Sequence, residues 1–398
     1  MAGSIPTLIL KGPGVRPLTK GHLWVYSGAV NRVVGRAKAG QVVRLADGAK
    51  KFLAWAWYSP DSRIRARILS RRPEEEFKDG WWAGRLDRAR AGRRVLEEDP
   101  ETEAFRLCNS EADGLPGLTI DIYGRAAVVQ AMTPGAEEIK KGVALWLKER
   151  MGVEPVLERD DGQSRRLEGL PRSGGLLLGT EPKEPLTILE GGMKFQVDLV
   201  EGQKTGWYLD QRVNRGLAAA FAGGKHVLDC FSYSGGFSAR ALAAGARSST
   251  LVDSSARALR GAKANLELNG LADRASLVQG NVFEILRQYR DAGRRFGLII
   301  LDPPKLAPTR AQASKAGRAY KDINLLALKL LEPQGVLATF SCSAGVEPAF
   351  FQEIVHWAAL DAGVGLQILA RLSQPEDHPI LLGMPETEYL KGLICRPL

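Results

Sequence analysis

The stretch D-C-F-S-Y-S-G-G-F-S (229–238) continues the apolar run H-V-L and turns from a strand into a helix through two glycines. The same alternation repeats downstream: strand-like runs at 249–253, 296–302 and 336–341 are separated by helix-like ones such as A-R-A-L-R-G-A-K-A-N-L-E-L (256–268). Strands that alternate with helices predict a parallel sheet with helices on both faces. Ligands of such sheets bind beyond the carboxyl ends of the strands.

A glycine turn and a distant carboxylate predict a nucleoside site at that edge. Asp253 ends the second strand 18 residues after Gly235, a spacing at which a carboxylate accepts hydrogen bonds from ribose hydroxyls. A dinucleotide would favour G-x-G-x-x-G, because its pyrophosphate needs close backbone amides. The corresponding stretch is S-Y-S-G-G-F (232–237), which favours a nucleoside cofactor without phosphate, most commonly S-adenosylmethionine.

The next two strands end in residues with chemical potential. L-D-P-P-K (301–305) contains two prolines that stiffen a turn, so Asp302 and the Pro303 carbonyl are expected at the cofactor mouth, although D-P-P could also be a plain turn. Cys342 lies between Ser341 and Ser343 at the end of the following strand. A lone cysteine most often fills a core, so this position gains meaning only from its neighbours.

Composition narrows the class of protein. The 398 residues are 44% hydrophobic and 25% charged, with no run long enough for a membrane span and no basic-then-apolar leader, so we expect a cytoplasmic protein of two or three domains. Its four cysteines lie far apart without a CxxC pair and its four histidines do not cluster, so no metal site is expected. Cysteine chemistry would require a reduced thiol.

The positive charge is concentrated at the N-terminus. Residues 1–72 carry 14 Lys and Arg against Asp47 and Asp61, a balance of +12, while the remaining chain sums to −2. A localised basic face is typical of a polyanion-binding protein, such as a nucleic-acid binder, although it could serve solubility alone. Within R-I-R-A-R-I-L (63–69), alternation predicts three guanidinium groups on one strand face and the apolar residues facing inward.

Three regions follow from these patterns. Residues 1–72 contain short β-like runs separated by Gly, Pro and Asp turns, which predict a small β-barrel. Residues 73–198 predict an α+β module that begins with one helix near Glu74, its acids in the first turn, and continues with a strand pair, a helix at 136–150 and further strands. Residues 199–398 form the α/β part.

Several motifs together resemble the ribosomal RNA large-subunit methyltransferase I family over nearly the whole chain. They are G-Q-K-T-G-W-Y-L-D-Q-R (202–212), D-C-F-S-Y-S-G-G-F-S, V-D-S-S-A-R-A-L (252–259), D-P-P-K, Y-K-D-I-N (320–324), T-F-S-C-S (339–343), D-H-P (377–379), Y-L-K-G (389–392) and, in the first region, G-H-L-W-V-Y-S-G-A. The resemblance implies an N-terminal PUA-like domain, the central α+β module and a C-terminal class I, Rossmann-like methyltransferase domain. It further implies S-adenosylmethionine, C5 of a cytosine in 23S rRNA as the target, and often a homodimer.

Carried over position by position, the resemblance implies a set of cofactor-binding residues: Gln211, Asp229, Phe231, Ser232, Gly235, Gly236, Asp253, Ser254, Asn281, Val282, Asp302 and Pro303. Asp302 would also act at the methyl-transfer mouth. One position departs from the family pattern, because G-N-V-F places Asn281 where an acidic residue usually meets the adenine amine. An amide carbonyl can still accept from that amine, so affinity rather than reaction type should change.

With that context, Cys342 is expected to be the nucleophile, because cytosine C5 needs a thiolate at C6 before it can accept a methyl group. Exocyclic-amine methyltransferases typically place an aromatic residue after the proline turn, where this chain has Lys305. The C5 proton acceptor is unassigned, and Ser341 and Ser343 are expected on the opposite face, orienting backbone and RNA.

The residues predicted to contact RNA are mostly basic: Lys20, Arg63, Arg65, Arg67, Lys204, Arg212, Lys305, His378 and Lys391. The target base must leave its stack to reach the thiol. Two alternatives stay open: methylation of another base or atom, and an RNA-binding ribosome-assembly factor whose methylation is secondary.

Overall fold

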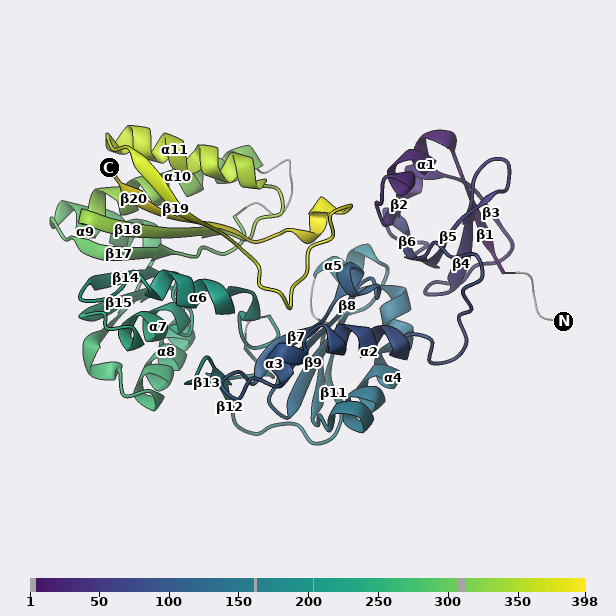
Figure 1. The fold of residues 1–398 in the computed structure, drawn as a ribbon, viewed down its shortest axis with the longest axis horizontal. Helices are drawn as coiled ribbons and strands as arrows, with labels where there is room; N and C mark the ends of the chain where they lie inside the picture. Colours follow the sequence, from purple (N-terminus) through teal and green to yellow (C-terminus); the bar gives the residue numbers. More distant parts are fainter. Residues whose placement is uncertain (1–4, 161–162, 203, 307–312) are drawn as a thin grey trace. The chain divides into compact units, whose positions relative to one another are not determined.

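The computed structural model describes residues 5–160, 163–202, 204–306 and 313–398, which form two compact units (Figure 1). The C-terminal unit contains residues 193–196, 210–375 and 388–398, and the N-terminal unit contains the rest. The predicted domain boundaries after residues 72 and 198 stay predictions. Within the described parts, no helix combines the length and apolarity needed to cross a membrane.

The C-terminal unit is built on a seven-stranded sheet in the order β16-β15-β14-β17-β18-β20-β19. Its strands are β14 (His226–Cys230), β15 (Ser248–Asp253), β16 (Ala275–Gln279), β17 (Phe296–Leu301), β18 (Leu331–Ser341), β19 (Leu366–Ser373) and β20 (Lys391–Pro397). The five strands from β14 to β18 run parallel. The alternation predicts four of these parallel strands but not β16. In contrast, β20 is antiparallel to both neighbours. Gly392 permits this insertion, because a Cβ there would lie 2.5 Å from the Phe340 ring.

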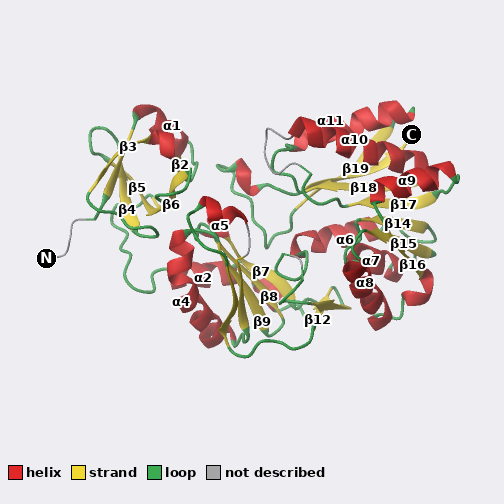
Figure 2. Ribbon diagram, turned by 180° about the vertical axis from the view of Figure 1, so that it is seen from behind, coloured by secondary structure: helices red, strands yellow, loops and turns green. Residues whose placement is uncertain are grey.

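Helices cover both faces of this sheet, which confirms the predicted doubly covered architecture (Figure 2). One face carries α6 (Arg212–Ala219), α7 (Gly236–Ala243) and α8 (Ala256–Leu268), and the other carries α9 (Val282–Asp291), α10 (Ala313–Leu330) and α11 (Pro348–Ala362). The second set encloses a continuous apolar core with β17 and β18. All strand ends from β14 to β18 therefore meet at one edge, where the candidate site lies.

The predicted β-rich N-terminal part is confirmed as a six-stranded sheet in the order β2-β6-β5-β4-β1-β3. Its strands are β1 (Thr7–Leu10), β2 (Trp24–Tyr26), β3 (Val30–Val34), β4 (Val42–Ala46), β5 (Phe52–Tyr58) and β6 (Ile64–Ser70). The sequence interpretation did not include β3 or α1 (Gly12–Thr19), whose G-P-G-V-R-P-L-T looks like a loop. Pro13 is nevertheless compatible with the first helical turn, where its missing amide hydrogen costs nothing.

The central module contains a five-stranded sheet in the order β11-β10-β9-β8-β7. Its strands are β7 (Ala104–Asn109), β8 (Leu118–Tyr123), β9 (Ala126–Ala131), β10 (Val156–Asp160) and β11 (Ser173–Leu178), and a two-stranded sheet of β12 (Leu186–Glu190) and β13 (Met193–Val197) follows. The predicted helix at 136–150 is confirmed as α4 (Pro134–Met151). A short helix, α5 (Gln163–Leu167), follows β10.

Two expectations for this module were wrong. The single helix near Glu74 is replaced by α2 (Ala83–Ala91) and α3 (Arg94–Glu97), so the acidic run at 74–76 precedes the helix instead of filling its first turn. Gly80 adopts φ of 75°, which a helix start cannot include. The predicted strand pair is a three-stranded meander, β7 to β9.

Candidate active site

The loop between β14 and α7 is tight and strained. Phe231, Tyr233 and Gly235 have φ of 60°, 46° and 79°, in the left-handed region that only glycine adopts without cost. A Cβ on Gly235 would lie 3.1 Å from the Cβ of Ala262, so a larger residue would require α8 to move. Strain of this kind clusters at ligand sites, where the surrounding structure enforces it.

Unpaired buried polar atoms accompany this loop. Ser232 Oγ, Ser234 Oγ and Gln211 Nε2 are buried and form no hydrogen bond within the described parts of the chain. Buried polar atoms are almost always paired in native proteins, so these three indicate a polar ligand that completes them. Two of the three residues, Gln211 and Ser232, were predicted from sequence to bind the cofactor.

Carboxylates make the same edge negative. Asp229, at 1% exposure, accepts hydrogen bonds from the amide and the hydroxyl of Ser238, at 3.1 and 2.7 Å. The pKa of Asp229 is raised to about 7, mainly by burial and also by the charges of Asp302 and Asp253, while the hydrogen bonds of Ser238 act to lower it. Three carboxylates within electrostatic reach suit a cationic ligand, and S-adenosylmethionine carries both a sulfonium and an ammonium group.

Asp253 lies at the end of β15, where the sequence predicts it. Its two carboxylate oxygens accept from the amides of Tyr233 and Ser255, at 2.9 and 2.8 Å. The carboxylate therefore ties the glycine loop to the start of α8. Each of its oxygens has a further lone pair that a ribose hydroxyl could use.

Asn281 begins α9 as its N-cap, with Oδ1 accepting from the amide of Phe283 at 3.0 Å. This cap does not exclude the predicted adenine contact, because the same amide oxygen can accept a second hydrogen bond. The contact stays a prediction. The Phe283 ring lies 6.3 Å from the Phe231 ring in an edge-to-face arrangement. Sequence reasoning did not include Phe283, although it stands two residues after Asn281.

All the predicted cofactor residues belong to the C-terminal unit, and most of them follow the carboxyl ends of its parallel strands. Asp229 lies within β14, and Asp253 is the last residue of β15. After β14 come Phe231, Ser232, Gly235 and Gly236; Ser254 follows β15; Asn281 and Val282 follow β16; and Asp302 and Pro303 follow β17. Gln211 precedes α6 instead. The parallel topology thus gathers residues from four separate stretches of sequence at one edge.

Cys342 lies at this edge, immediately after β18. Its Sγ donates to the Pro303 carbonyl at 3.9 Å, so the thiol lies beside the proline turn. Cys342 is partly exposed, whereas the other three cysteines are buried. Burial raises the thiol pKa of all three, to about 12 for Cys395. Only Cys342 therefore has the access that a nucleophile requires.

Ser341 and Ser343 lie behind Cys342 with no exposed surface. Ser341 Oγ donates to the Tyr320 hydroxyl at 3.0 Å, and that hydroxyl shares a hydrogen bond of the same length with Ser343 Oγ. The expectation that both serines orient RNA is therefore wrong, because neither reaches the surface. Tyr320, from the Y-K-D-I-N motif, received no role from sequence, and the structure makes it the anchor of this strand end.

Lys391 faces the same strand end from β20. Its ammonium donates to the carbonyls of Ser343 and Tyr389, at 2.7 and 3.0 Å, and the residue is 5% exposed. Burial lowers the pKa of Lys391 to about 8, while the charge of Cys342 acts in the opposite direction. The RNA contact of this lysine stays a prediction; its amine donates to the carbonyl of Ser343, next to Cys342.

The residues predicted to bind RNA divide by exposure. Those exposed are Lys20, Arg63, Lys204 and Lys305, Arg65 is half-buried, and those buried are Arg67, Arg212, His378 and Lys391. The basic strand face is corrected at Arg67, which pairs with Glu168 at 2.6 Å in the interior of the N-terminal unit. His378 is 1% exposed and lies 3.2 Å from the Asp377 carboxylate.

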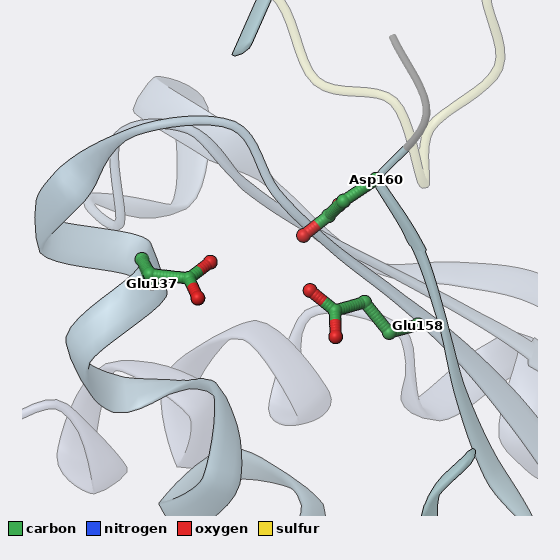
Figure 3. Close-up of side chains that lie close together, drawn as sticks. All are labelled: Glu137, Glu158 and Asp160. Atoms are coloured by element: carbon green, nitrogen blue, oxygen red, sulfur yellow. The ribbon is translucent and has the colours of Figure 1, made fainter. Parts of the chain in front are cut away.

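A cluster of acids in the central module invites comparison with a metal site. Figure 3 shows Glu137 from α4 facing Glu158 and Asp160 from β10. Lys140 pairs with both glutamates, and Arg165 pairs with Glu137 and Asp160, so the acids already have cationic partners. The cluster is an internal ion-pair network.

Protonation completes the charge match in this network. Burial and a hydrogen bond with Glu158 raise the pKa of Asp160 to about 8. Burial opposes ionisation of Glu158 as well, but hydrogen bonds from Asp160 and Lys140 hold its pKa below the usual value. With one proton on Asp160, the network contains two negative and two positive charges.

A parallel sheet with helices on both faces, a glycine loop after its first strand and carboxylates at the neighbouring strand ends are typical of a Rossmann-like nucleoside-binding domain, and the family comparison shows that this one is an S-adenosylmethionine-dependent methyltransferase. A family model for such enzymes matches residues 134–395, and a PUA-like domain model matches residues 8–71. The structure of a protein assigned as a methyltransferase, complexed with SAH, shares the fold, with a TM-score of 0.85, 23% identity and coverage of 99% of this chain and 100% of that chain.

The sequence comparison identifies the particular family. Ribosomal RNA large subunit methyltransferase I of Klebsiella pneumoniae (strain 342) is 41% identical, over 98% of each chain. The protein of the same name from Pseudoalteromonas translucida (strain TAC 125) is 44% identical, over 96% of each chain. The chain belongs to the ribosomal RNA large subunit methyltransferase I family, which confirms the resemblance found in its motifs.

Proposed function

We propose that this protein methylates C5 of a cytosine in large-subunit ribosomal RNA, with S-adenosylmethionine as methyl donor and Cys342 as nucleophile. The family supports the RNA substrate, since its members at 41% and 44% identity are named for large-subunit ribosomal RNA. The position of Cys342 supports C5 as the methylated atom and a thiolate mechanism. Its thiol is partly exposed and lies beside the Asp302–Pro303 turn, at the edge where the predicted cofactor residues gather.

The chemistry explains why a thiol is needed at that place. When bound, S-adenosylmethionine supplies an electrophilic methyl group on its sulfonium. Cytosine C5 is too weak a nucleophile to accept that group unaided. Addition of the Cys342 thiolate to C6 converts the ring into an enamine, whose C5 is nucleophilic. Loss of the C5 proton and expulsion of the thiolate then regenerate Cys342.

The chain's own residues prepare the site for these steps. The carboxylates of Asp229, Asp253 and Asp302 would hold the cationic donor, and Ser232 and Gln211 would use their unpaired polar atoms on it. The stiff turn at Pro303 holds in place the carbonyl to which the Cys342 thiol donates. The base must be flipped out of its stack to enter, because a stacked cytosine exposes neither face of C6.

RNA binding by the N-terminal region is the second part of the proposal. The PUA-like match and the balance of +12 over residues 1–72 support it. Lys20 and Arg63 are exposed in this region and are the predicted residues best placed for phosphate contact. Possible homodimer formation, implied by the resemblance, is a separate prediction.

A direct test measures the product. Large-subunit rRNA is incubated with labelled cofactor and the protein, and its nucleosides are separated by mass spectrometry. We expect 5-methylcytidine from the wild type and none from Cys342→Ala, whereas Cys108→Ala and Cys395→Ala retain activity. N4-methylcytidine or another methylated base, formed equally by Cys342→Ala, would support the rival methyltransferase reading. Rescue of ribosome assembly in cells by Cys342→Ala would favour the assembly-factor reading.

A further inference from the structure

Lys391 is a buried cation that pairs with no carboxylate in the part of the chain that the structure describes. It opens β20, is 5% exposed and donates to the carbonyls of Ser343 and Tyr389. Among the described residues no carboxylate forms an ion pair with it. Removing an ammonium group from water costs roughly several kcal/mol unless an opposite charge is close. The two carbonyl dipoles compensate only part of this desolvation cost. A nearby anion would compensate the rest of this cost.

Cys342 is the group placed to become that anion. Register pairs Lys391 with Ser341 across the β18–β20 ladder, and its Nζ reaches the carbonyl of Ser343 at 2.7 Å. The lysine therefore spans the peptide segment that carries Cys342 between these two serines. The charge of Cys342 acts to raise the pKa of Lys391, which is consistent with the two groups lying within electrostatic reach of each other.

The other titratable groups around Lys391 do not provide the counter-charge. Tyr320, packed from α10, shares its hydroxyl with Ser341 and Ser343, and burial raises its pKa, so it stays neutral. Glu388 attracts the ammonium and Lys305 repels it, but both side chains are exposed, and water screens their charges. Cys342 remains the partner.

We propose that Lys391 is a positioning residue for the nucleophile: its ammonium is the counter-ion of the Cys342 thiolate. This inference rests on the proposed function of Cys342. On ionisation the S–H bond breaks, its electron pair stays on Sγ and the proton leaves to water, while the ammonium keeps its own protons. When the C6–S bond later breaks, its electron pair returns to Sγ, and the same ammonium stabilises the departing thiolate.

The test measures how fast iodoacetamide alkylates Cys342 between pH 5.5 and 9.5, followed by peptide mass spectrometry. In the wild type we expect a midpoint below the value of about 8.5 of a free thiol. Lys391→Met should move the midpoint up by about one pH unit, making alkylation roughly tenfold slower at pH 7 with an unchanged plateau at high pH. Lys391→Arg should stay near the wild type, because it keeps the charge.

Lys225→Met is the matched control. Lys225 is half-buried and its pKa is also lowered by burial, but it precedes β14, at the opposite end of the strands from Cys342. Its substitution should leave the Cys342 midpoint in place, and an equal shift in this control would overturn the proposal.

Three further results would overturn the proposal. A wild-type midpoint at or above 8.5 would do so whether or not the variants fold. An unchanged midpoint in Lys391→Met, with a lower plateau, would make the lysine a backbone support only. An unchanged midpoint with weaker RNA binding would make it the phosphate contact first predicted. A shifted midpoint in an enzyme that forms no 5-methylcytidine would uphold the ion pair and refute the proposed function instead.

Discussion

Two largely buried clusters of charged residues in this protein differ in how their charges are paired. In the central module, Glu137, Glu158 and Asp160 meet Lys140 and Arg165, and each acid contacts a base or shares a proton. At the sheet edge of the C-terminal unit, the partners within the described residues are amides and a hydroxyl for Asp229 and Asp253, and carbonyls for Lys391.

The comparison distinguishes charges that are paired within the protein from charges that need a ligand or a reacting group as partner. A matched network costs little extra to keep buried and stabilises one arrangement of helix and strand. Unmatched charges are expensive, so they persist where a ligand or a reaction completes them. We therefore assign the central network to folding, and the sheet edge is where we propose that the methyl donor and the cysteine act.

The largest expected effect is the loss of stability when one cation of the central ion-pair network is removed. Arg165→Met removes the cation that pairs with Glu137 and also contacts Asp160, which should lower the free energy of unfolding by about 3–5 kcal/mol in urea titrations. Lys391→Met, which removes a cation that has no carboxylate partner, should cost no more than about 1 kcal/mol. Equal losses in both variants would erase the distinction between the two clusters.

A smaller effect concerns the pH dependence of cofactor binding. The folded-state pKa of Asp229 is about 7, so its carboxylate is largely protonated at pH 6 and largely ionised at pH 8. Because a cationic donor prefers the ionised form, the affinity for S-adenosylmethionine should rise up to about tenfold between these values, measured by calorimetry. Asp229→Asn should flatten this rise, and a steep rise in that variant would assign it to another group.

The contribution of Asp229 to the stability of the cofactor-free protein changes with pH in the opposite direction to cofactor affinity. Because the pKa of Asp229 is raised above its unfolded value of 3.8, the folded state without cofactor binds more protons than the unfolded chain between pH 3.8 and about 7. Its contribution to stability therefore falls as pH rises through that window. The wild type should gain more than Asp229→Asn from bound cofactor at pH 8.

The smallest effect is expected on the RNA side. Replacing the exposed Lys20 and Arg63 by Gln should weaken rRNA binding and reduce the slope of log affinity against log salt by about 0.7–0.9 for each phosphate that the protein no longer neutralises. Arg67→Gln should act mainly on folding, because Arg67 is already paired with Glu168. A larger salt-slope change in Arg67→Gln than in the double variant would reverse these assignments.

The sequence predicted what depends on local pattern. Strand–helix alternation placed the glycine loop, Asp253, the proline turn and Cys342 at successive strand ends, and the parallel sheet brings those ends together. The family motifs supported the prediction of S-adenosylmethionine as the cofactor. These features are readable because each is set by residues within one short stretch.

The remaining features depend on partners distant in sequence. Lys391 was interpreted as a phosphate contact because nothing near Y-L-K-G shows that β20 inserts antiparallel beside β18. Arg67 was placed on an outer face because period-two alternation cannot reveal Glu168, 101 residues away. Burial of a charged residue is decided by such distant pairing, so the charges with the greatest functional meaning were the hardest to assign.

The role of Cys342 is tested most directly with an RNA that carries 5-fluorocytosine at the methylated position. Fluorine cannot leave C5 as a cation, so elimination stalls and the thiolate stays bonded to C6. We predict a protein–RNA adduct that survives denaturation, maps by mass spectrometry to Cys342 and is absent from Cys342→Ala. An adduct on Cys108, Cys230 or Cys395, or normal turnover of unmodified rRNA by Cys342→Ala, would contradict the account.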